Sequence, residues 1–315
     1  MNYSKSKILS LLSLLSLCLF LFISPSFAQD DDIDLLSQLD IEDEQEEFKT
    51  LASFKTTRVV NSHSLETTHK NVLDVRISHR FGLISSGIND LFGLDQATMR
   101  MGFDYGVLDN LTVGVGRSTY QKTFDGFVKY KPVWQSEGSN RVPISVLAVA
   151  GVTVNTQRFA ALNYDMTFTR RLNYFSQIII GRKFNDKFSL QLMPTHVHRN
   201  LVETRAEGNS IFALGGAARY KFVKRVAVNL ESYYVFPNQL GLTQQPYSFS
   251  IGFDVETGGH VFQLFFSNSI GFIEKAFIAE NTADFFRGDI HFGFTISRVF
   301  DFKKDPTKAK KNKKN

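Results

Sequence analysis

Cysteine is almost absent from this 315-residue chain, since its one cysteine, Cys18, lies in an N-terminal segment that we expect to be removed. A mature chain without a thiol has no disulfide bonds and no cysteine-ligated metal. Long apolar runs are missing too. After Gln29 no stretch reaches the roughly 18 apolar residues that a transmembrane helix needs.

Membrane β-strands are not excluded by that absence, because they alternate lipid-facing apolar residues with polar residues that face a lumen. Their average hydropathy is therefore unremarkable. The chain holds 31 Phe and 10 Tyr, an aromatic content that favours such strands. Its 7 prolines and 21 glycines are ordinary numbers, which argues against a disordered or fibrous chain.

The first 28 residues have the three parts of a secretory signal peptide. Lys5 and Lys7 precede an apolar run, and Ser-Phe-Ala precedes Gln29. We expect cleavage between Ala28 and Gln29, and therefore an exported protein. Retention of the segment as a membrane anchor is disfavoured, because the run is short for a spanning helix.

Charge of one sign is concentrated at each end of the mature chain. Residues 30–47 hold ten acidic residues and no basic one, and residues 301–315 hold seven lysines against two aspartates. Such blocks usually stay solvated and disordered, so we interpret 29–49 as an acidic periplasmic lead segment and 301–315 as a basic tail. Alternatively, the two ends attract each other or a periplasmic partner. Nucleic acid is excluded as a partner, because an exported chain does not meet it.

Segments of about ten residues with period-two alternation recur from residue 71 onward, which is typical of membrane strands. In the first segment Leu73, Val75 and Ile77 share one face, and Asp74 and Arg76 share the other. We predict an all-β, antiparallel, up-and-down transmembrane barrel over residues 50–300, with about twelve strands in a range of ten to fourteen. The candidate strands are 71–81, 98–107, 111–120, 124–131, 143–154, 172–182, 187–197, 210–222, 226–236, 246–256, 260–268 and 289–300.

The connections alternate between short and long, as they do between the two ends of an outer-membrane barrel. Short turns follow the second, sixth, eighth and tenth candidate strands, at 108–110, 185–186, 223–225 and 257–259. The rule fails once, because the link after the third strand is short and the link after the fourth is long. This parity predicts that both termini are periplasmic.

Charged side chains on the predicted inner face are the candidate functional residues. They form either a salt-bridged polar core, which we favour because buried charges need partners, or the lining of a wet, selective pore. Helical spacing in two loops, at 88–92 and 272–277, indicates turns that fold inward as a plug or cap the rim, and we favour the cap. The candidate lumen charges are Asp74, Arg76, Arg80, Arg100, Asp104, Lys129, Arg219, Glu231 and Asp254.

Catalytic and metal-binding patterns are weak in this sequence. His196 and His198 share a strand face, but no third ligand lies nearby, whereas zinc sites in proteins take three or four ligands. A Gly-x-Ser-x-Gly elbow and phosphate-binding glycine motifs are absent. We therefore predict no enzyme activity, no cofactor and no metal.

Several phrases resemble an uncharacterised family of Bacteroidota-type outer-membrane β-barrels with a domain of unknown function. They are FKTTRVVNSHSLE at 54–66, SHRFG at 78–82, LFGLDQATMRMGFDYG at 91–106, ETGGHVFQLFFSNS at 256–269 and FGFTISRVF at 292–300. The resemblance implies a fold and an outer-membrane location, and it assigns no functional residue.

Together these features predict an integral protein of the outer-membrane lipid bilayer that acts as a structural or docking barrel with a polar, salt-bridged lumen. A periplasmic partner would bind through the acidic lead segment or the basic tail. A small-solute channel is the alternative. A water-soluble, lipocalin-like barrel, which would bury its aromatic faces, is a minor one.

Overall fold

The computed structural model describes residues 48–50, 52–138, 141–158, 166–202, 204–257 and 259–302. The predicted signal peptide, its cleavage site at Ala28 and Gln29, and nearly all of the acidic lead segment and the basic tail lie outside the described residues. Within the part of the chain that the structure describes, no helix combines the length and apolar composition needed to cross a bilayer.

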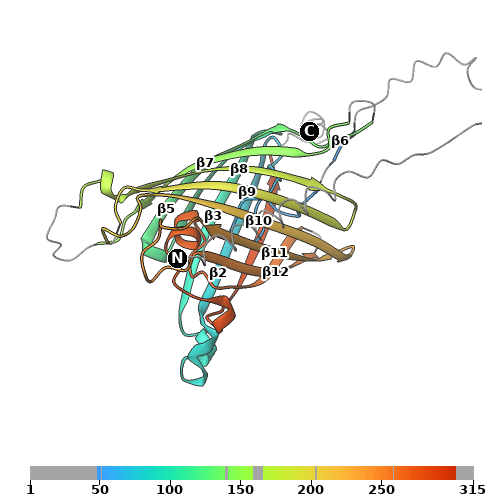
Figure 1. Cartoon of the computed structure of the whole chain (residues 1–315). Helices are drawn as coiled ribbons and strands as arrows, with labels where there is room; N and C mark the ends of the chain where they lie inside the picture. Colours follow the sequence, from blue (N-terminus) through green and yellow to red (C-terminus); the bar gives the residue numbers. More distant parts are fainter. Residues whose placement is uncertain are drawn as a thin grey trace, which may run out of the picture. The chain divides into compact units, whose positions relative to one another are not determined.

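Twelve antiparallel strands form one closed barrel, in which consecutive wall strands pair and β14 pairs with β2 (Figure 1). The prediction of a closed antiparallel barrel of about twelve strands is confirmed. The wall strands are β2 (Val72–Leu83), β3 (Ala97–Leu108), β4 (Leu111–Ser118), β5 (Thr123–Val133), β7 (Ser145–Asn155), β8 (Leu172–Lys183), β9 (Phe188–Arg199), β10 (Ser210–Val223), β11 (Val226–Val235), β12 (Tyr247–Thr257), β13 (His260–Ser267) and β14 (His291–Asp301).

The remaining elements are short and lie in the connections. They are strands β1 (Phe48–Lys49) and β6 (Ser136–Glu137), the 3-10 turns η1 (Ile84–Ser86), η2 (Ile88–Gly93), η3 (Tyr120–Lys122), η4 (Thr169–Arg171) and η6 (Phe285–Arg287), and the π-helical turn η5 (Lys275–Ala279).

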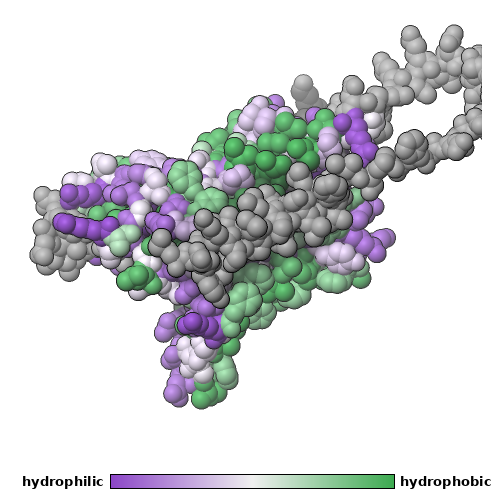
Figure 2. Space-filling view, viewed as in Figure 1, coloured by the Kyte–Doolittle hydropathy of each residue, from purple (hydrophilic) through white to green (hydrophobic). Residues whose placement is uncertain are grey.

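Side chains alternate between the two faces of the wall as the sequence pattern predicts. Along β3, Met101 and Phe103 point outward and are exposed, whereas Arg100 and Asp104 point inward and are buried. Apolar residues cover much of the outer surface in the view of Figure 2. The aromatic faces therefore lie mainly on the outside, which is the reverse of what a lipocalin-like barrel requires.

Connection lengths distinguish the two ends of the barrel. One end, the short-turn end, carries the links 109–110, 184–187, 224–225 and 258–259, which confirms the four predicted turns. The opposite end, the long-loop end, carries links such as 84–96, 200–209, 236–246 and 268–290. The predicted exception is also present, since η3 alone joins β4 to β5 at the long-loop end, and residues 134–144 join β5 to β7 at the short-turn end.

The long link at the short-turn end has a structural reason. Its strand β6 pairs with β1, so that Phe48 lies opposite Glu137 and Lys49 opposite Ser136. The backbone N–H of Thr50 continues the ribbon by donating to the carbonyl of Gln135 at 2.7 Å. This link is therefore long because it includes β6, which pairs with β1 just before the N-terminal part of the chain enters the barrel.

Candidate functional site

Residues 52–69, which we call the lumen segment, fill the barrel interior and do not form part of its wall. Hydrogen bonds join the segment to inward-facing side chains of β3, β5, β9, β11 and β13. Strands on all sides of a closed barrel can reach one segment only if that segment lies inside it. Most of its residues between Ser53 and Thr68 are buried.

The centre of the lumen segment is a small β-hairpin. Ser64 N–H donates to the carbonyl of Thr57 at 3.0 Å, and Val59 N–H donates to the carbonyl of Ser62 at 2.9 Å. Arg58 and His63 form a bridge between the two arms. Val60 and Asn61 occupy the tip, where backbone N–H groups have no partner within the hairpin and need an acceptor from the wall.

Glu231 on β11 supplies that acceptor. Its carboxylate receives the backbone N–H groups of Val60, Asn61 and Ser62, at distances from 3.0 to 3.3 Å. It also receives the Ser62 hydroxyl at 2.7 Å. A buried carboxylate with four donors is a charge-assisted arrangement, in which each bond stabilises more than a neutral one does. Glu231 therefore binds the tip of the hairpin to the wall.

Lys129 and Asp104 hold the base of the hairpin. Lys129 Nζ donates to the carbonyls of Thr57 at 2.8 Å and Glu66 at 2.7 Å, one on each side of the hairpin. The Thr57 hydroxyl donates to Asp104 Oδ2 at 2.9 Å and accepts from the Arg76 guanidinium at 2.9 Å. The charged wall residues are thus partners of the lumen segment as well as of one another.

Apolar packing accompanies these polar contacts. Phe54, Val59 and Leu65 of the lumen segment join one buried cluster with wall side chains such as Phe127 and Phe175. His63 lies among these rings, with its centroid 4.6 Å from that of Phe127.

The surroundings of His63 disfavour the charged form of its ring. Burial, followed by the nearby Arg58 guanidinium, lowers the pKa of His63 well below its ordinary value. Its Nε2 lies 3.5 Å from Glu274 Oε1.

A second segment enters from the long-loop end. Residues 272–279 of the β13–β14 link, which we call the inward loop, are buried throughout and include η5. The prediction that this loop caps the rim is wrong, because Phe272 and Phe277 belong to the same buried apolar cluster as Phe54 and Leu65 of the lumen segment. The other predicted cap, at 88–92, stays outside, where Ile88, Leu91 and Phe92 are exposed.

Two arginines connect the inward loop to the lumen segment. Arg58 donates to Glu274 Oε1 at 3.1 Å, and both side chains are less than a tenth exposed. Burial raises the pKa of Glu274 above its ordinary value, although Arg58 opposes the shift. Arg80 donates to Asn61 Oδ1 and to the carbonyls of Ser269 and Gly271, and its guanidinium lies 4.2 Å from the centroid of the Phe272 ring.

All of the candidate lumen charges face the interior, and none is more than 9% exposed. Beyond the contacts above, Arg76 pairs with Asp74 at 3.0 Å, and Arg219 lies 3.8 Å from Asp254. Arg100 pairs with Asp125, which the sequence analysis did not single out although it alternates inward on β5. The arrangement is a salt-bridged core built around a filled lumen.

The two paired histidines of β9 lie elsewhere. His196 and His198 point to the outside of the barrel, where His196 stacks on Phe212 and His198 contacts the Ser210 hydroxyl at 2.8 Å. Among the described residues, no group of three or more His, Cys, Asp or Glu side chains is placed to hold a metal ion.

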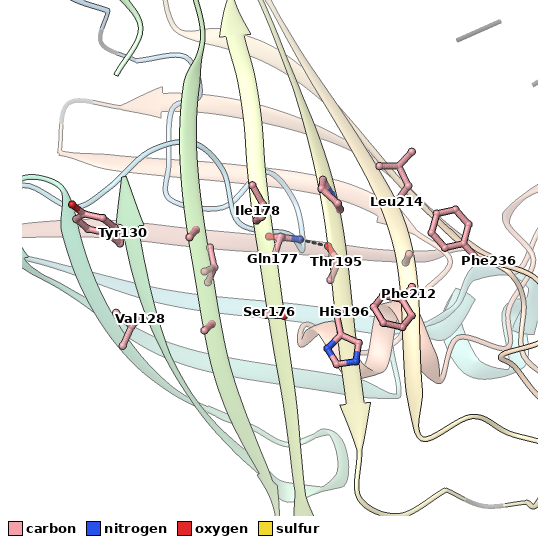
Figure 3. A pocket seen from close by; sticks show the side chains of 15 residues that line it. Val128, Tyr130, Ser176, Gln177, Ile178, Thr195, His196, Phe212, Leu214 and Phe236 are labelled. Atoms are coloured by element: carbon pink, nitrogen blue, oxygen red, sulfur yellow. Dashed lines mark hydrogen bonds between the residues drawn. The ribbon is translucent and has the colours of Figure 1, made fainter. Parts of the chain in front are cut away.

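Two hollows flank this core. One, of about 460 Å³, opens at the short-turn end beside the lumen segment and is lined by residues including Lys55, Glu66, Trp134 and Asp74. The other, of about 570 Å³, lies on the outer wall of β5 and β7–β10, where the outward side chains Ile178, Phe212 and Leu214 surround small ones (Figure 3).

Comparison with known proteins gives a family but no curated relative. The sequence profile described as "Membrane bound beta barrel domain (DUF5777)" matches residues 54–300. No curated protein matches the chain.

Among solved structures, the NanC porin is 8% identical, with 72% of this chain and 98% of that chain covered and a TM-score of 0.45. The KdgM porin is 10% identical, with 73% and 99% covered and a TM-score of 0.41. An outer membrane channel from Pseudomonas putida F1 is 12% identical, with 75% and 98% covered and a TM-score of 0.44.

The matched range contains the lumen segment from Phe54 onward together with the wall strands as far as Phe300. This chain belongs to the family of membrane bound beta barrel domains.

Proposed function

We propose that the protein is exported through a cleaved signal peptide and acts in the outer membrane as a non-enzymatic structural or docking barrel, closed by its own N-terminal segment. The observation that carries this proposal is the occupied lumen. Glu231, Lys129 and Arg80 hold the lumen segment and the inward loop at the centre of the barrel through buried hydrogen bonds. A constitutively open pore would leave these charges facing water.

The acidic lead segment is the proposed docking element, and the basic tail is a second one. The lead segment precedes β1 and the lumen segment in the sequence, so a periplasmic partner with a basic surface would bind the same stretch of chain that continues into the lumen. Opposite charges steer such encounters and make them sensitive to salt.

Conductance across a planar bilayer tests the closed state. We expect the wild-type protein to conduct little and a variant lacking residues 52–69 to conduct steadily, because the deletion removes the lumen segment and leaves only the inward loop in the lumen. A large, steady conductance of the wild-type protein would contradict the proposal. If the deletion variant does not fold, Glu231→Ala provides the second test, since it releases the hairpin tip without shortening the chain.

A channel that opens when the lumen segment withdraws is the second candidate. The hollow beside Lys55 favours it, because it already reaches Asp74 from the short-turn end. Asn61 Nδ2 lies 2.9 Å from Ser250 Oγ, so cysteines at these two positions in a Cys18→Ser background are used to cross-link the hairpin tip to the wall, with disulfide formation checked by mass spectrometry. Brief openings that occur in the reduced double variant and disappear on oxidation would support a channel that opens when the lumen segment withdraws. Openings that persist in the oxidised variant would exclude this mechanism.

Deletions test docking separately. Removal of residues 30–47 should release a co-purifying partner without lowering the thermal stability of the barrel, and removal of 303–315 tests the tail in the same way. Unchanged partners after both deletions would refute docking through the charged ends, whatever the conductance shows.

A further inference from the structure

The β2–β3 link at the long-loop end exposes an unusual set of large apolar side chains. Ile88 is 72% exposed, Leu91 50%, Phe92 52% and Leu94 45%. The link projects away from the barrel as the segment that contains η1 and η2 (Figure 1). Apolar side chains of this size rarely stay in water without a partner when they gather in one patch.

The backbone conformation of this link directs the apolar side chains outward. Leu91 and Phe92 both have positive φ, 46° and 56°, a conformation that costs a side chain with a Cβ about 1–2 kcal/mol at each position. Phe92 N–H donates to the carbonyl of Gly87 at 2.7 Å. Gly93, whose φ is 86°, lies so close to Gly82 that an added Cβ would be 2.6 Å from its carbonyl carbon. Strain of this kind persists where the conformation is used.

The outer wall beside the link carries an aromatic band at the same end of the barrel. The Phe81 ring is stacked against Phe292 at 5.9 Å between centroids, and His79 is stacked against Phe294 at 5.3 Å. Aromatic bands mark the interfaces of membrane barrels. In Figure 2 the apolar side of the projecting link continues into the apolar wall.

The size of the patch identifies its occupant. Four apolar side chains fall well short of the roughly 800 Å² that each partner buries in a stable protein interface. They are sufficient for shallow insertion at the boundary between lipid headgroups and acyl chains. Continuity with the outward-facing wall of a membrane-bound barrel points to the same lipid surface.

We propose that the β2–β3 link is a membrane-surface anchor: Ile88, Leu91 and Phe92 insert into the lipid leaflet at the long-loop end of the barrel. The strained backbone fixes their direction, and Asn89 and Asp95, both exposed, remain available to headgroups and water. The anchor is independent of the lumen segment and of the proposed docking role.

Single-cysteine probes test the anchor, because a Cys18→Ser background contains no other thiol. Full-length protein is reconstituted in phosphatidylcholine vesicles, and an environment-sensitive fluorophore is attached at Phe92→Cys. Met101→Cys on the wall is the lipid-facing control, and Ala206→Cys, an exposed position in the β9–β10 link, is the aqueous control. Quenching by lipids with brominated acyl chains and by aqueous iodide is measured for each.

We expect the probe at position 92 to be quenched by brominated lipid about as strongly as the wall probe and to be at least about twofold less accessible to iodide than the probe at position 206. A probe that iodide quenches freely and brominated lipid does not would overturn the proposal. Shielding from both quenchers, with energy transfer between labelled copies, would instead assign the patch to a second copy and would also overturn it.

A second variant guards against damage to the link by the label. In Leu91→Asn/Phe92→Asn the backbone keeps a residue type that tolerates positive φ, while the apolar side chains are lost. With the probe moved to Ile88→Cys, lipid quenching should fall at least about twofold in this variant. Unchanged quenching would count against insertion by Leu91 and Phe92.

Discussion

Ser62 donates both its hydroxyl, at 2.7 Å, and its backbone N–H, at 3.0 Å, to one carboxylate oxygen of Glu231. Residues 169 positions apart in the sequence are thereby joined at the centre of the barrel. The wall supplies a fixed negative charge, and the lumen segment supplies a turn whose donors converge on it. The lumen segment is therefore held in place by specific contacts of individual wall residues.

Glu231→Gln should loosen the hairpin tip without opening the wall. The amide keeps one acceptor oxygen but presents an NH₂ group to backbone donors, and the loss of a charge-assisted bond costs about 1.5–3 kcal/mol. We expect hydrogen exchange at Val60, Asn61 and Ser62 to accelerate roughly tenfold to a hundredfold. Glu256→Gln is the matched control, because its pair with Lys55 is partly exposed and contributes little. Equal exchange in the two variants would show that Glu231 does not bind the tip.

Arg58 and Glu274 should behave as a coupled pair in unfolding experiments. Removal of one partner leaves a buried charge without its counterion, which costs about 3–5 kcal/mol. We expect Arg58→Met and Glu274→Leu each to lower the free energy of unfolding by such an amount, and the double variant to lose clearly less than the sum. Urea unfolding in the same detergent measures all four proteins; strict additivity would contradict the coupling.

Gly106→Ala should displace the C-terminal end of the lumen segment, at Thr68 and His69. An added Cβ would lie 1.9 Å from the His69 carbonyl oxygen and 2.5 Å from that of Thr68, and backbone atoms cannot rotate away as a flexible side chain does. We expect a loss of about 1–3 kcal/mol, the usual cost of overpacking. Gly126→Ala is the control, because its Cβ would meet nothing closer than 3.8 Å. The melting temperature of Gly106→Ala should be several degrees below that of Gly126→Ala. Identical melting temperatures would mean that Thr68 and His69 move aside without cost.

Asp284 should make the η6 turn sensitive to acid. The hydrogen bond from the Tyr247 hydroxyl is the main cause that lowers the pKa of Asp284 below its ordinary value of 3.8. A lowered pKa in the folded state stabilises the fold above the unfolded pKa, and this contribution is lost as the pH falls through the folded value. We expect the Phe286 amide, which donates to Asp284 at 2.9 Å, to lose protection below about pH 4, after correction for intrinsic exchange.

The corresponding variant, Asp284→Asn, should lose that protection already at neutral pH, and Asp95→Asn in another loop should not. Protection of Phe286 that survives in Asp284→Asn would show that the carboxylate does not organise the turn.

The wall was predictable from the sequence because two independent patterns agree. Alternation specifies which side chains of β2 and β3 face the lumen, since a slip of one residue would turn every charge toward lipid. Connection lengths then fix the up-and-down order. The single exception at residues 134–144 was visible, but its cause was not, because pairing with β1 depends on where the N-terminal chain enters.

The filled lumen was not predicted, because Phe54–Thr68 is too short and irregular to show a period of its own. The signal lay in the wall. Inward-facing glycines leave space that wall side chains do not fill: a Cβ at Gly181 would lie 2.6 Å from Leu65, and one at Gly252 would lie 2.9 Å from Val60. Glycine on the inner face of a barrel of this width indicates that another part of the chain approaches there.

The lumen segment is followed almost directly by the first wall strand. Asn71 N–H donates to the Gly106 carbonyl at 2.9 Å, and β2 begins at Val72. The lumen segment is consequently joined covalently to the barrel whose interior it fills. Binding of the lumen segment is intramolecular, so its effective concentration is high and dilution does not release it.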